Sequence, residues 1–220
     1  SVDGHKYINN AIENGARCVM VEEGCDLKEL NIPKDVAVVM AKDTREALAV
    51  SSANFYKNPS KKFKLIGVTG TKGKTTTTYM IKNVLEACGI KTGLIGTIET
   101  IIGDEKIPAC NTTPESYQIH ESFAKMVDCG CKAVVMEVSS QGLKLDRTAG
   151  IMFDIGVFTN LEPDHIGPNE HASFEEYLNC KAQLFKQCKT GIVNADDKHT
   201  EQIIKDCICD IETYGLSKDA

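Results

Sequence analysis

The sequence predicts a P-loop-type α/β fold, with a mostly parallel sheet, helices on both faces and a smaller α/β segment in front. Two observations lead to it. Short apolar runs of strand length alternate with longer segments of helical period along the 220 residues. A glycine-rich loop joins one such run to a helix, as in folds that bind phosphate at the end of a strand. This alternation implies parallel strands with crossover helices on both faces.

The first 60 residues predict the smaller α/β segment. Its expected elements are a helix, two strands and a second helix, at residues 5–14, 17–21, 36–40 and 44–55. Gly15 suits the end of the first helix, and Asp43 suits the N-cap of the second. The polar stretch 57–62 contains a proline and predicts a domain boundary near residue 60.

Residues 61–220 predict the main domain. Strands are expected at 65–68, 92–95, 133–138, 155–159 and 191–193, and helices at 75–88, 114–128, 174–188 and 198–206. Parallel strands place their carboxyl ends at one edge of the sheet, so polar residues that follow these strands are expected to meet there.

Composition excludes several classes of protein. The net charge of -6 and the pI of about 5.4 give no indication of nucleic-acid binding. Neither an apolar run of 18 residues nor a signal-peptide pattern is present, so membrane insertion is not expected. The ten cysteines include no Cys-x-x-Cys pair, which argues against a zinc site. The phosphate loop implies a reducing compartment, which argues against a disulfide framework. We expect free, mostly buried thiols in a cytoplasmic protein.

The loop GTKGKT at residues 70–75 lies between an expected strand and an expected helix. Glycines let the backbone wrap around phosphate oxygens, and the helix N-terminus adds a favourable dipole. Lys74 can reach the outer phosphates, and the Thr75 hydroxyl can coordinate magnesium. Val68 stands where the longer Walker pattern has glycine, so this is a shorter variant. We expect it to bind a nucleotide and magnesium through Gly70, Thr71, Lys72, Gly73, Lys74, Thr75 and Thr76.

This loop, TGTKGKTT at residues 69–76, resembles the ATP loop of the Mur ligase family, with Lys72 in place of the common asparagine. Folylpolyglutamate and cyanophycin synthetases share the loop. The NTTP segment at 111–114 resembles the MurE-type branch, which adds the third residue of the peptidoglycan stem peptide. The resemblance implies that Thr112 and Thr113 contact a UDP-sugar dipeptide. These hydroxyls precede a proline-started helix, which is a suitable anion site.

EVSSQGL at 137–143 resembles the next family motif. Glu137 ends an expected strand and would bind the magnesium that bridges the ATP phosphates. The resemblance assigns substrate contacts to Ser139 and Arg147, and the planar fork of arginine suits anionic oxygens. Gln141 and Leu145 replace family residues, and we assign them no contact.

TNLEPDH at 159–165 and the helix around Lys181 complete the resemblance. It implies that His165 and a carbamylated Lys181 hold a second magnesium ion, and carbamylation requires a lysine whose pKa falls on burial. Asn160 and Asp164 are expected to order the loop, and a phosphate contact of Asn160 is the alternative. NADD at 194–197 places Asn194 near the adenine.

The resemblance spans nearly the whole chain but only part of the family. It implies an incomplete UDP-binding domain over residues 1–60, the central ATPase domain over 61–220, and no C-terminal amino-acid-binding domain. Either a truncated polypeptide or a longer gene product would explain this.

The implied activity is ATP-dependent amide ligation. The third amino acid, meso-diaminopimelate or L-lysine, is added to UDP-N-acetylmuramoyl-L-alanyl-D-glutamate through an acyl phosphate, by a cytoplasmic monomer. Two other interpretations stay open: a sister enzyme, such as another Mur ligase or a folylpolyglutamate synthetase, and an ATP-binding module without ligase activity. The 220 residues by themselves are expected to be inactive as a ligase.

Overall fold

The computed structural model describes residues 3–28, 30–164, 166–168 and 170–217. The chain forms two compact units, one ending at Leu48 and the other beginning at Ala49, inside helix α2 (Thr44–Phe55). The predicted domain boundary near residue 60 stays a prediction.

The first unit contains a short 3-10 helix, one α-helix and two parallel strands: η1 (Gly4–Tyr7), α1 (Ile8–Glu13), β1 (Cys18–Glu22) and β2 (Ala37–Ala41). Its small core consists of Ile8, Val19, Val21 and Val36. The predicted cap is confirmed, because Asp43 Oδ1 accepts the backbone N–H groups of Arg45 at 2.8 Å and Glu46 at 3.0 Å.

In the second unit, eight described strands form one sheet with the order β10-β9-β8-β3-β7-β4-β5-β6. They are β3 (Lys64–Thr69), β4 (Thr92–Ile95), β5 (Glu99–Ile102), β6 (Glu105–Pro108), β7 (Ala133–Glu137), β8 (Phe153–Phe158), β9 (Cys188–Asn194) and β10 (Asp210–Tyr214). All neighbours from β10 to β4 pair in parallel, and the β4–β5 and β5–β6 pairs are antiparallel, so β5 is the one described strand of this sheet that runs in the opposite direction. The mostly parallel α/β fold is therefore confirmed.

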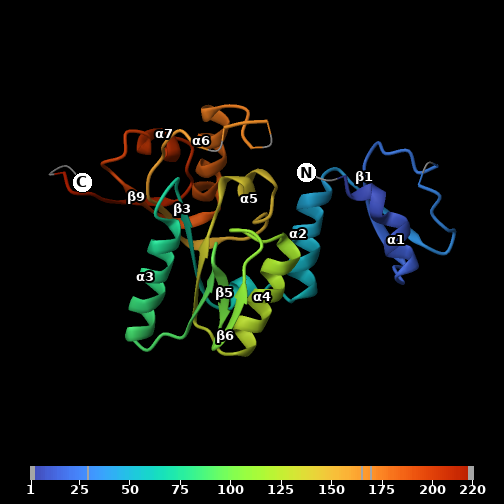
Figure 1. The fold of residues 1–220 in the computed structure, drawn as a ribbon, viewed down its shortest axis with the longest axis horizontal. Coiled ribbons are helices and arrows are strands. Elements are labelled where there is room, and N and C mark those ends of the chain that lie inside the picture. Colours follow the sequence, from blue (N-terminus) through green and yellow to red (C-terminus); the bar gives the residue numbers. More distant parts are fainter. Residues whose placement is uncertain (1–2, 29, 165, 169, 218–220) are drawn as a thin grey trace. The chain divides into compact units, whose positions relative to one another are not determined.

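The helices of this unit are α3 (Lys74–Ala87), α4 (Ser116–Asp128), α5 (Ser140–Lys144), α6 (Phe174–Ala182) and α7 (Thr200–Ile204), with 3-10 turns η2 (Pro59–Lys61) and η3 (Gln183–Lys186). Alternate strand residues face opposite layers. Ile66 packs towards Ile81 of α3, and Leu65 belongs to the larger core with Phe123 of α4. Figure 1 shows α3 and α4 on opposite sides of the sheet.

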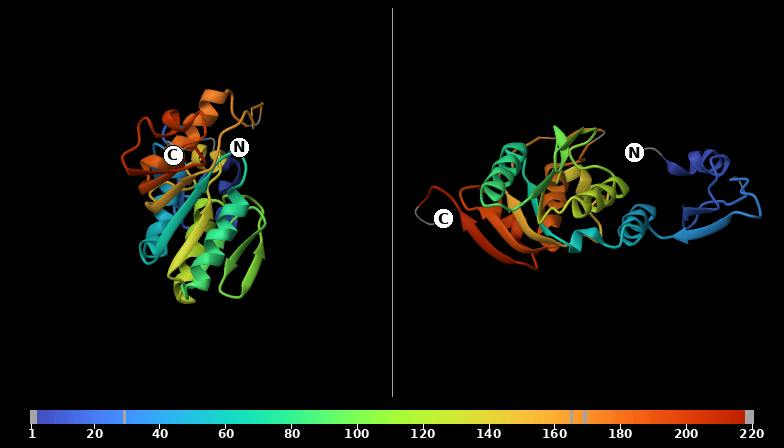
Figure 2. Two further views of the ribbon diagram at one scale, coloured as in Figure 1. Left: turned by 90° about the vertical axis from the view of Figure 1, so that its left-hand side faces the viewer. Right: turned by 90° about the horizontal axis from the view of Figure 1, so that it is seen from below.

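The predicted strands and helices are present, with ends shifted by a few residues. The helix expected at 174–188 is shorter: α6 ends at Ala182 and continues as the 3-10 turn η3. The β5–β6 hairpin was not predicted, because each strand has only four residues and β6 is mainly polar and exposed. Figure 2 (left) shows this hairpin at one edge of the sheet.

All ten cysteines are free thiols, as expected, but the prediction that most are buried was wrong. Only Cys131, Cys180 and Cys188 are buried. Within the described residues, no helix combines the length and the apolar character that crossing a bilayer requires.

Gly67 offers a test of the packing beneath the phosphate loop. A Cβ atom there would lie 2.8 Å from ring carbons of Phe153 and 3.1 Å from a methyl group of Leu184, both in the core. Gly67→Ala should lower the free energy of unfolding by about 1–3 kcal/mol through overpacking, measured by urea denaturation.

Gly167→Ala is the matched control, because a Cβ atom there meets nothing within 4 Å. Both changes stiffen the unfolded chain alike, so the difference between them isolates the steric clash. Equal stability of the two variants would contradict this packing.

Candidate active site

The phosphate loop connects β3 to α3, as predicted. Gly70 has φ of 147°, and a Cβ atom there would collide with the Thr159 hydroxyl oxygen and lie 3.2 Å from the Asn160 nitrogen. Gly73, with φ of 86°, is the N-cap of α3. Glycine at position 70 therefore allows the end of β8 to lie directly against the loop.

The end of β8 holds the loop through several hydrogen bonds. The backbone N–H of Lys72 donates to Asn160 Oδ1 at 2.9 Å, and the Lys72 carbonyl accepts from the Thr159 hydroxyl at 2.8 Å and Asn160 Nδ2 at 3.0 Å. Lys72 Nζ lies 2.8 Å from Asp164 Oδ2, and this pairing raises the pKa of Lys72. The prediction that Asn160 and Asp164 order the loop is confirmed.

Two lysines bind the same carbonyl oxygen beneath the loop. Gly70 O accepts from Lys74 Nζ at 2.9 Å and from Lys181 Nζ at 2.8 Å. Lys181 is only 1% exposed, and its ammonium lies 4.5 Å from the Tyr177 ring centroid. Burial, reinforced by the charge of Lys74, holds the pKa of Lys181 well below its ordinary value. Burial also lowers the pKa of Lys74.

Glu137 is fully buried at the end of β7, on the neighbouring strand. Its carboxylate accepts the Thr75 hydroxyl at 3.0 Å, the Thr97 N–H at 2.8 Å and the Thr97 hydroxyl at 3.1 Å. Sequence analysis missed Thr97. Its position two residues after the end of β4, at the same edge of the sheet, was the available signal.

This donor set fits magnesium. Carboxylate and hydroxyl oxygens are the hard ligands that the ion prefers, and one or two carboxylates with substrate phosphates are its usual protein environment. In the described part of the chain no three His, Cys, Asp or Glu side chains cluster as metal ligands. A magnesium ion here would therefore be held by Glu137, Thr75 and phosphate oxygens.

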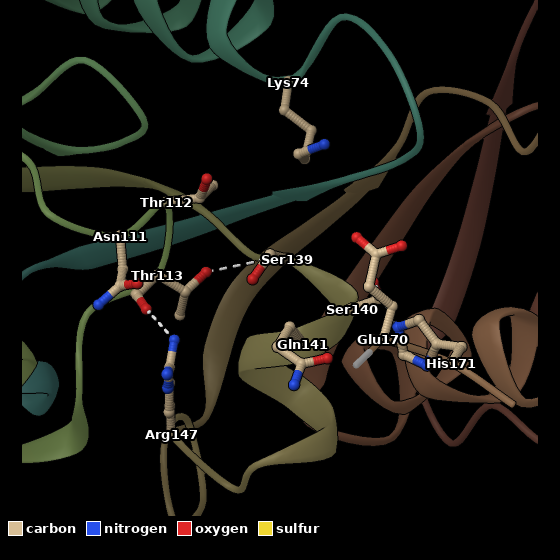
Figure 3. Close-up of a pocket in the computed structure, with 10 residues that line it drawn as sticks. All are labelled: Lys74, Asn111, Thr112, Thr113, Ser139, Ser140, Gln141, Arg147, Glu170 and His171. Carbon is tan, nitrogen blue, oxygen red and sulfur yellow. Dashed lines mark hydrogen bonds between the residues drawn. The ribbon is translucent and has the colours of Figure 1, made fainter. Parts of the chain in front are cut away.

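A polar cavity of about 330 Å³ adjoins the loop. Its lining residues come from the loop, the 111–113 segment, α5 and its flanks, and the end of the 159–171 segment: Lys74, Asn111, Thr112, Thr113, Ser139, Ser140, Gln141, Arg147, Glu170 and His171. In Figure 3, Lys74, Arg147 and Glu170 lie on different sides of this cavity. Its volume and its convergent polar groups suit part of a charged substrate.

Thr113 and Arg147 join the walls of the cavity. The Thr113 hydroxyl donates to the Glu137 carbonyl at 2.9 Å and accepts the Ser139 N–H at 2.9 Å. Arg147 Nη1 donates to Thr113 O at 2.8 Å, and Nη2 lies 2.6 Å from Glu115 Oε1. Arg147 Nε is buried without a hydrogen-bond partner among the described residues. The substrate segments predicted separately are therefore one connected wall.

Of the remaining predicted residues, some lie at the carboxyl ends of the strands and one lies outside the residues that the structure describes. Thr76 is exposed in the first turn of α3, and Asn194, at the end of β9, donates to Thr159 O at 2.9 Å. His165 lies outside the described residues. His171 is 1% exposed, and its Nε2 lies 2.9 Å from the Ser140 hydroxyl.

A strand–loop–helix phosphate site, a buried carboxylate beside it and an adjoining polar cavity define the class of nucleotide-binding α/β domains. Residues 68–220 match the family model described as the Mur ligase middle domain, and the chain therefore belongs to the Mur ligase family.

Curated relatives are similar over almost the whole chain. A UDP-N-acetylmuramoyl-L-alanyl-D-glutamate–2,6-diaminopimelate ligase of Clostridium tetani is 49% identical over 218 residues, which cover 99% of this chain and 44% of the relative. The enzyme of that name from Clostridium perfringens is 47% identical, covering 98% and 42%. The chain thus spans less than half the length of these relatives.

Solved structures agree on the fold. A structure of a UDP-N-acetylmuramoyl-L-alanyl-D-glutamate–2,6-diaminopimelate ligase superimposes with a TM-score of 0.83 at 26% identity, covering 98% of this chain and 44% of that one. A Mycobacterium tuberculosis folylpolyglutamate synthase, at 14% identity and a TM-score of 0.59, shares the fold alone over 76% of this chain.

Lys181 should destabilise the free protein at neutral pH. Its folded pKa lies below the unfolded value, so between the two the unfolded chain binds more protons and stability rises with pH. Lys181→Met should therefore raise the free energy of unfolding at pH 7 in bicarbonate-free buffer, and this advantage should shrink as pH increases. Gly70 O keeps Lys74 as its donor, so no carbonyl is orphaned.

Urea denaturation between pH 7 and pH 9.5 measures this effect. Lys186→Met is the control, because it makes the same substitution at a side chain that is 52% exposed. A loss of stability in Lys181→Met at pH 7 would show that the buried amine contributes to folding instead.

Proposed function

We propose that this chain forms the ATP-binding and acceptor-binding part of an ATP-dependent amide ligase of peptidoglycan synthesis. The enzyme joins 2,6-diaminopimelate to UDP-N-acetylmuramoyl-L-alanyl-D-glutamate. The observation that carries the proposal is the convergence of Lys74, Lys181 and Glu137 around one phosphate loop beside a polar cavity. The names of relatives that are 45–49% identical support diaminopimelate over lysine.

The polar cavity is proposed to hold the acceptor. Thr112, Thr113 and Ser139 offer hydroxyl groups, and Arg147 offers a cation for the anionic parts of a UDP-sugar peptide. The cavity also reaches Lys74, so a peptide carboxylate placed there would lie next to the γ-phosphate of ATP. Proximity of these two anions is the main requirement of the first step.

In that step a carboxylate oxygen of the acceptor attacks the γ-phosphorus, the bond to the β-phosphate oxygen breaks, and ADP leaves. The amino group of the incoming amino acid then attacks the acyl carbon, inorganic phosphate leaves, and the nitrogen loses a proton to give the amide. In the first step both reactants, the acceptor carboxylate and ATP, are anionic. Lys74 lowers the barrier of that step by offsetting their negative charge. No covalent bond to a side chain is required.

Two magnesium ions are proposed for the complete site. Thr75 and Glu137 would hold one, and His165 with carbamylated Lys181 would hold the other. Bound magnesium would neutralise phosphate charge. A neutral Lys181 amine can add carbon dioxide with loss of a proton, which turns a buried cation into an anion with two oxygen ligands. Its lowered pKa supports this reaction.

ATP itself is proposed to lie along the loop. The backbone N–H groups of residues 70–76 would surround the phosphates, and Asn194 would lie near the adenine. The interpretation as a nucleotide-binding module without ligase activity remains the second candidate for the 220-residue chain by itself, because the chain spans 44% of its relatives.

Removal of the Glu137 charge should separate metal binding from nucleotide binding. Glu137→Gln should weaken ATP binding in the presence of magnesium on the order of tenfold or more, with little change in its absence, measured by calorimetry with and without the ion. Glu105→Gln, on an exposed edge strand, is the control and should leave both affinities unchanged. Equal loss with and without magnesium would remove Glu137 from the proposed metal site.

Lys181 tests the ligase proposal directly. In the full-length protein that contains this chain, Lys181→Ala should abolish ligation of a panel of amino acids to UDP-N-acetylmuramoyl-L-alanyl-D-glutamate, and short carboxylates should restore part of the rate. Full activity of the variant would contradict the metal role of Lys181. Failure of the unaltered protein to join diaminopimelate would refute the substrate assignment.

Carbamylation of Lys181 can also be detected without an activity measurement. Carbon-13 NMR of the chain in labelled bicarbonate should show one carbamate signal that Lys181→Ala removes and Lys186→Ala retains. Persistence of the signal in Lys181→Ala would place the carbamate on another lysine.

A further inference from the structure

A second cavity, of about 590 Å³, lies at the amino ends of the parallel strands, whereas the phosphate loop lies at their carboxyl ends. Its charged lining consists of five lysines and one carboxylate, from Lys61, Lys62, Lys64, Lys132, Lys189 and Asp154. The proposed ligase reaction uses none of them. All six belong to the unit that begins at Ala49.

Topology brings these lysines together. The strands β9, β8, β3 and β7 are consecutive neighbours in the parallel sheet, so their amino ends form one continuous edge. Lys189 and Asp154 are the second residues of β9 and β8, Lys64 begins β3, and Lys132 directly precedes β7. The N–H of Lys64 donates to the Lys132 carbonyl at 2.9 Å, which fixes the two segments side by side.

The single carboxylate is already engaged. Asp154 Oδ1 lies 2.8 Å from Lys189 Nζ and 3.2 Å from Lys64 Nζ, and Oδ2 accepts the Leu65 N–H at 3.0 Å. Among the described residues, no carboxylate lies within 4.0 Å of the amines of Lys61, Lys62 or Lys132. Three exposed ammonium groups therefore remain beside a carboxylate that two other lysines share.

The charge of this cavity is opposite to that of the chain. Five lysines and one aspartate give +4, whereas the whole chain carries -6, so the remainder carries -10. Like charges gathered at one place repel one another unless an anion neutralises them. A cavity of this volume is large enough for a small ligand, within the usual range of roughly 300–1,000 Å³.

We propose that this lysine cavity is a binding site for a multiply charged, phosphate-bearing anion. Lysine ammonium groups act as compact point charges with rotatable donors, which suits phosphate oxygens in several orientations. The shared chemistry, several phosphate charges close together, occurs in free polyphosphates and in anionic phospholipid head groups. The site is independent of the phosphate loop, because the two lie at opposite ends of β3.

The test compares two triple variants of the same net charge. Lys61→Gln/Lys62→Gln/Lys132→Gln removes the three amines without a carboxylate partner and leaves the Asp154 pairs intact. Lys34→Gln/Lys42→Gln/Lys205→Gln removes three exposed lysines elsewhere and is the control. The free-anion probe is tripolyphosphate, and the membrane probe is vesicles with phosphatidylglycerol, compared with vesicles of phosphatidylcholine alone.

Amide NMR shifts locate the binding of tripolyphosphate, since the phosphate loop can also bind it. Shifts at residues 61–64, 132 and 150–154 report the lysine cavity, and shifts at 70–75 report the loop. Co-sedimentation measures vesicle binding. Compared with the unaltered chain, the cavity variant should bind tripolyphosphate or phosphatidylglycerol vesicles at least on the order of tenfold more weakly. The amide shifts of the phosphate loop and the binding by the control variant should stay unchanged.

If the cavity variant loses the tripolyphosphate-induced amide shifts at the cavity but still binds vesicles, the site is one for free phosphates. If it loses vesicle binding but keeps those shifts, the site is one for lipid head groups. Either result supports the proposal. No binding of either probe at this cavity, or equal binding by the two triple variants, would overturn it. Circular dichroism of each variant verifies that the fold is retained.

Discussion

The Gly70 carbonyl oxygen is the point on which the candidate site depends. It accepts hydrogen bonds from Lys74, at the start of α3, and from Lys181, on α6, more than a hundred residues later in the chain. Lys181 reaches it only because its side chain is buried, and the burial lowers its pKa. One backbone atom thereby connects the loop to both helices, and burial lowers the pKa of the second amine.

The parallel sheet explains why the other groups gather at the same place. Strands β3, β7 and β4 are neighbours, so Gly70, Glu137 and Thr97 follow their carboxyl ends side by side. Glu137 is buried but engaged by three donors, which makes a charged carboxylate tolerable there. The amino ends of the same strands lie on the opposite side of the sheet, where Lys64, Lys132 and Lys189 stand at or next to the first residues of β3, β7 and β9. The sheet therefore has a surface suited to phosphate at each end of its parallel strands. Backbone amides and a carboxylate form the one at the carboxyl ends, and side-chain ammonium groups form the one at the amino ends.

The polar cavity beside the loop shows how the motifs depend on one another. Thr113 bonds to the Glu137 carbonyl and to the Ser139 amide, and Arg147 bonds to Thr113. A displacement of the 111–115 segment would therefore move the strand end that carries Glu137. The proposed acceptor cavity and the proposed magnesium site therefore share these short contacts.

The sequence by itself determined the α/β fold, the position of the phosphate loop and most polar residues around it, because strand periods and a glycine loop are local patterns. It also predicted the N-cap at Asp43 and the ordering roles of Asn160 and Asp164. Only the tertiary structure showed the sharing of Gly70 O by two lysines, the role of Thr97, the burial of His171 and the lysine cavity. Each of these depends on which strands are neighbours and on what a side chain meets across the sheet. Strand order and burial are properties of the packed chain, so the position of Thr97 after β4 becomes informative only once β4 is known to lie beside β7.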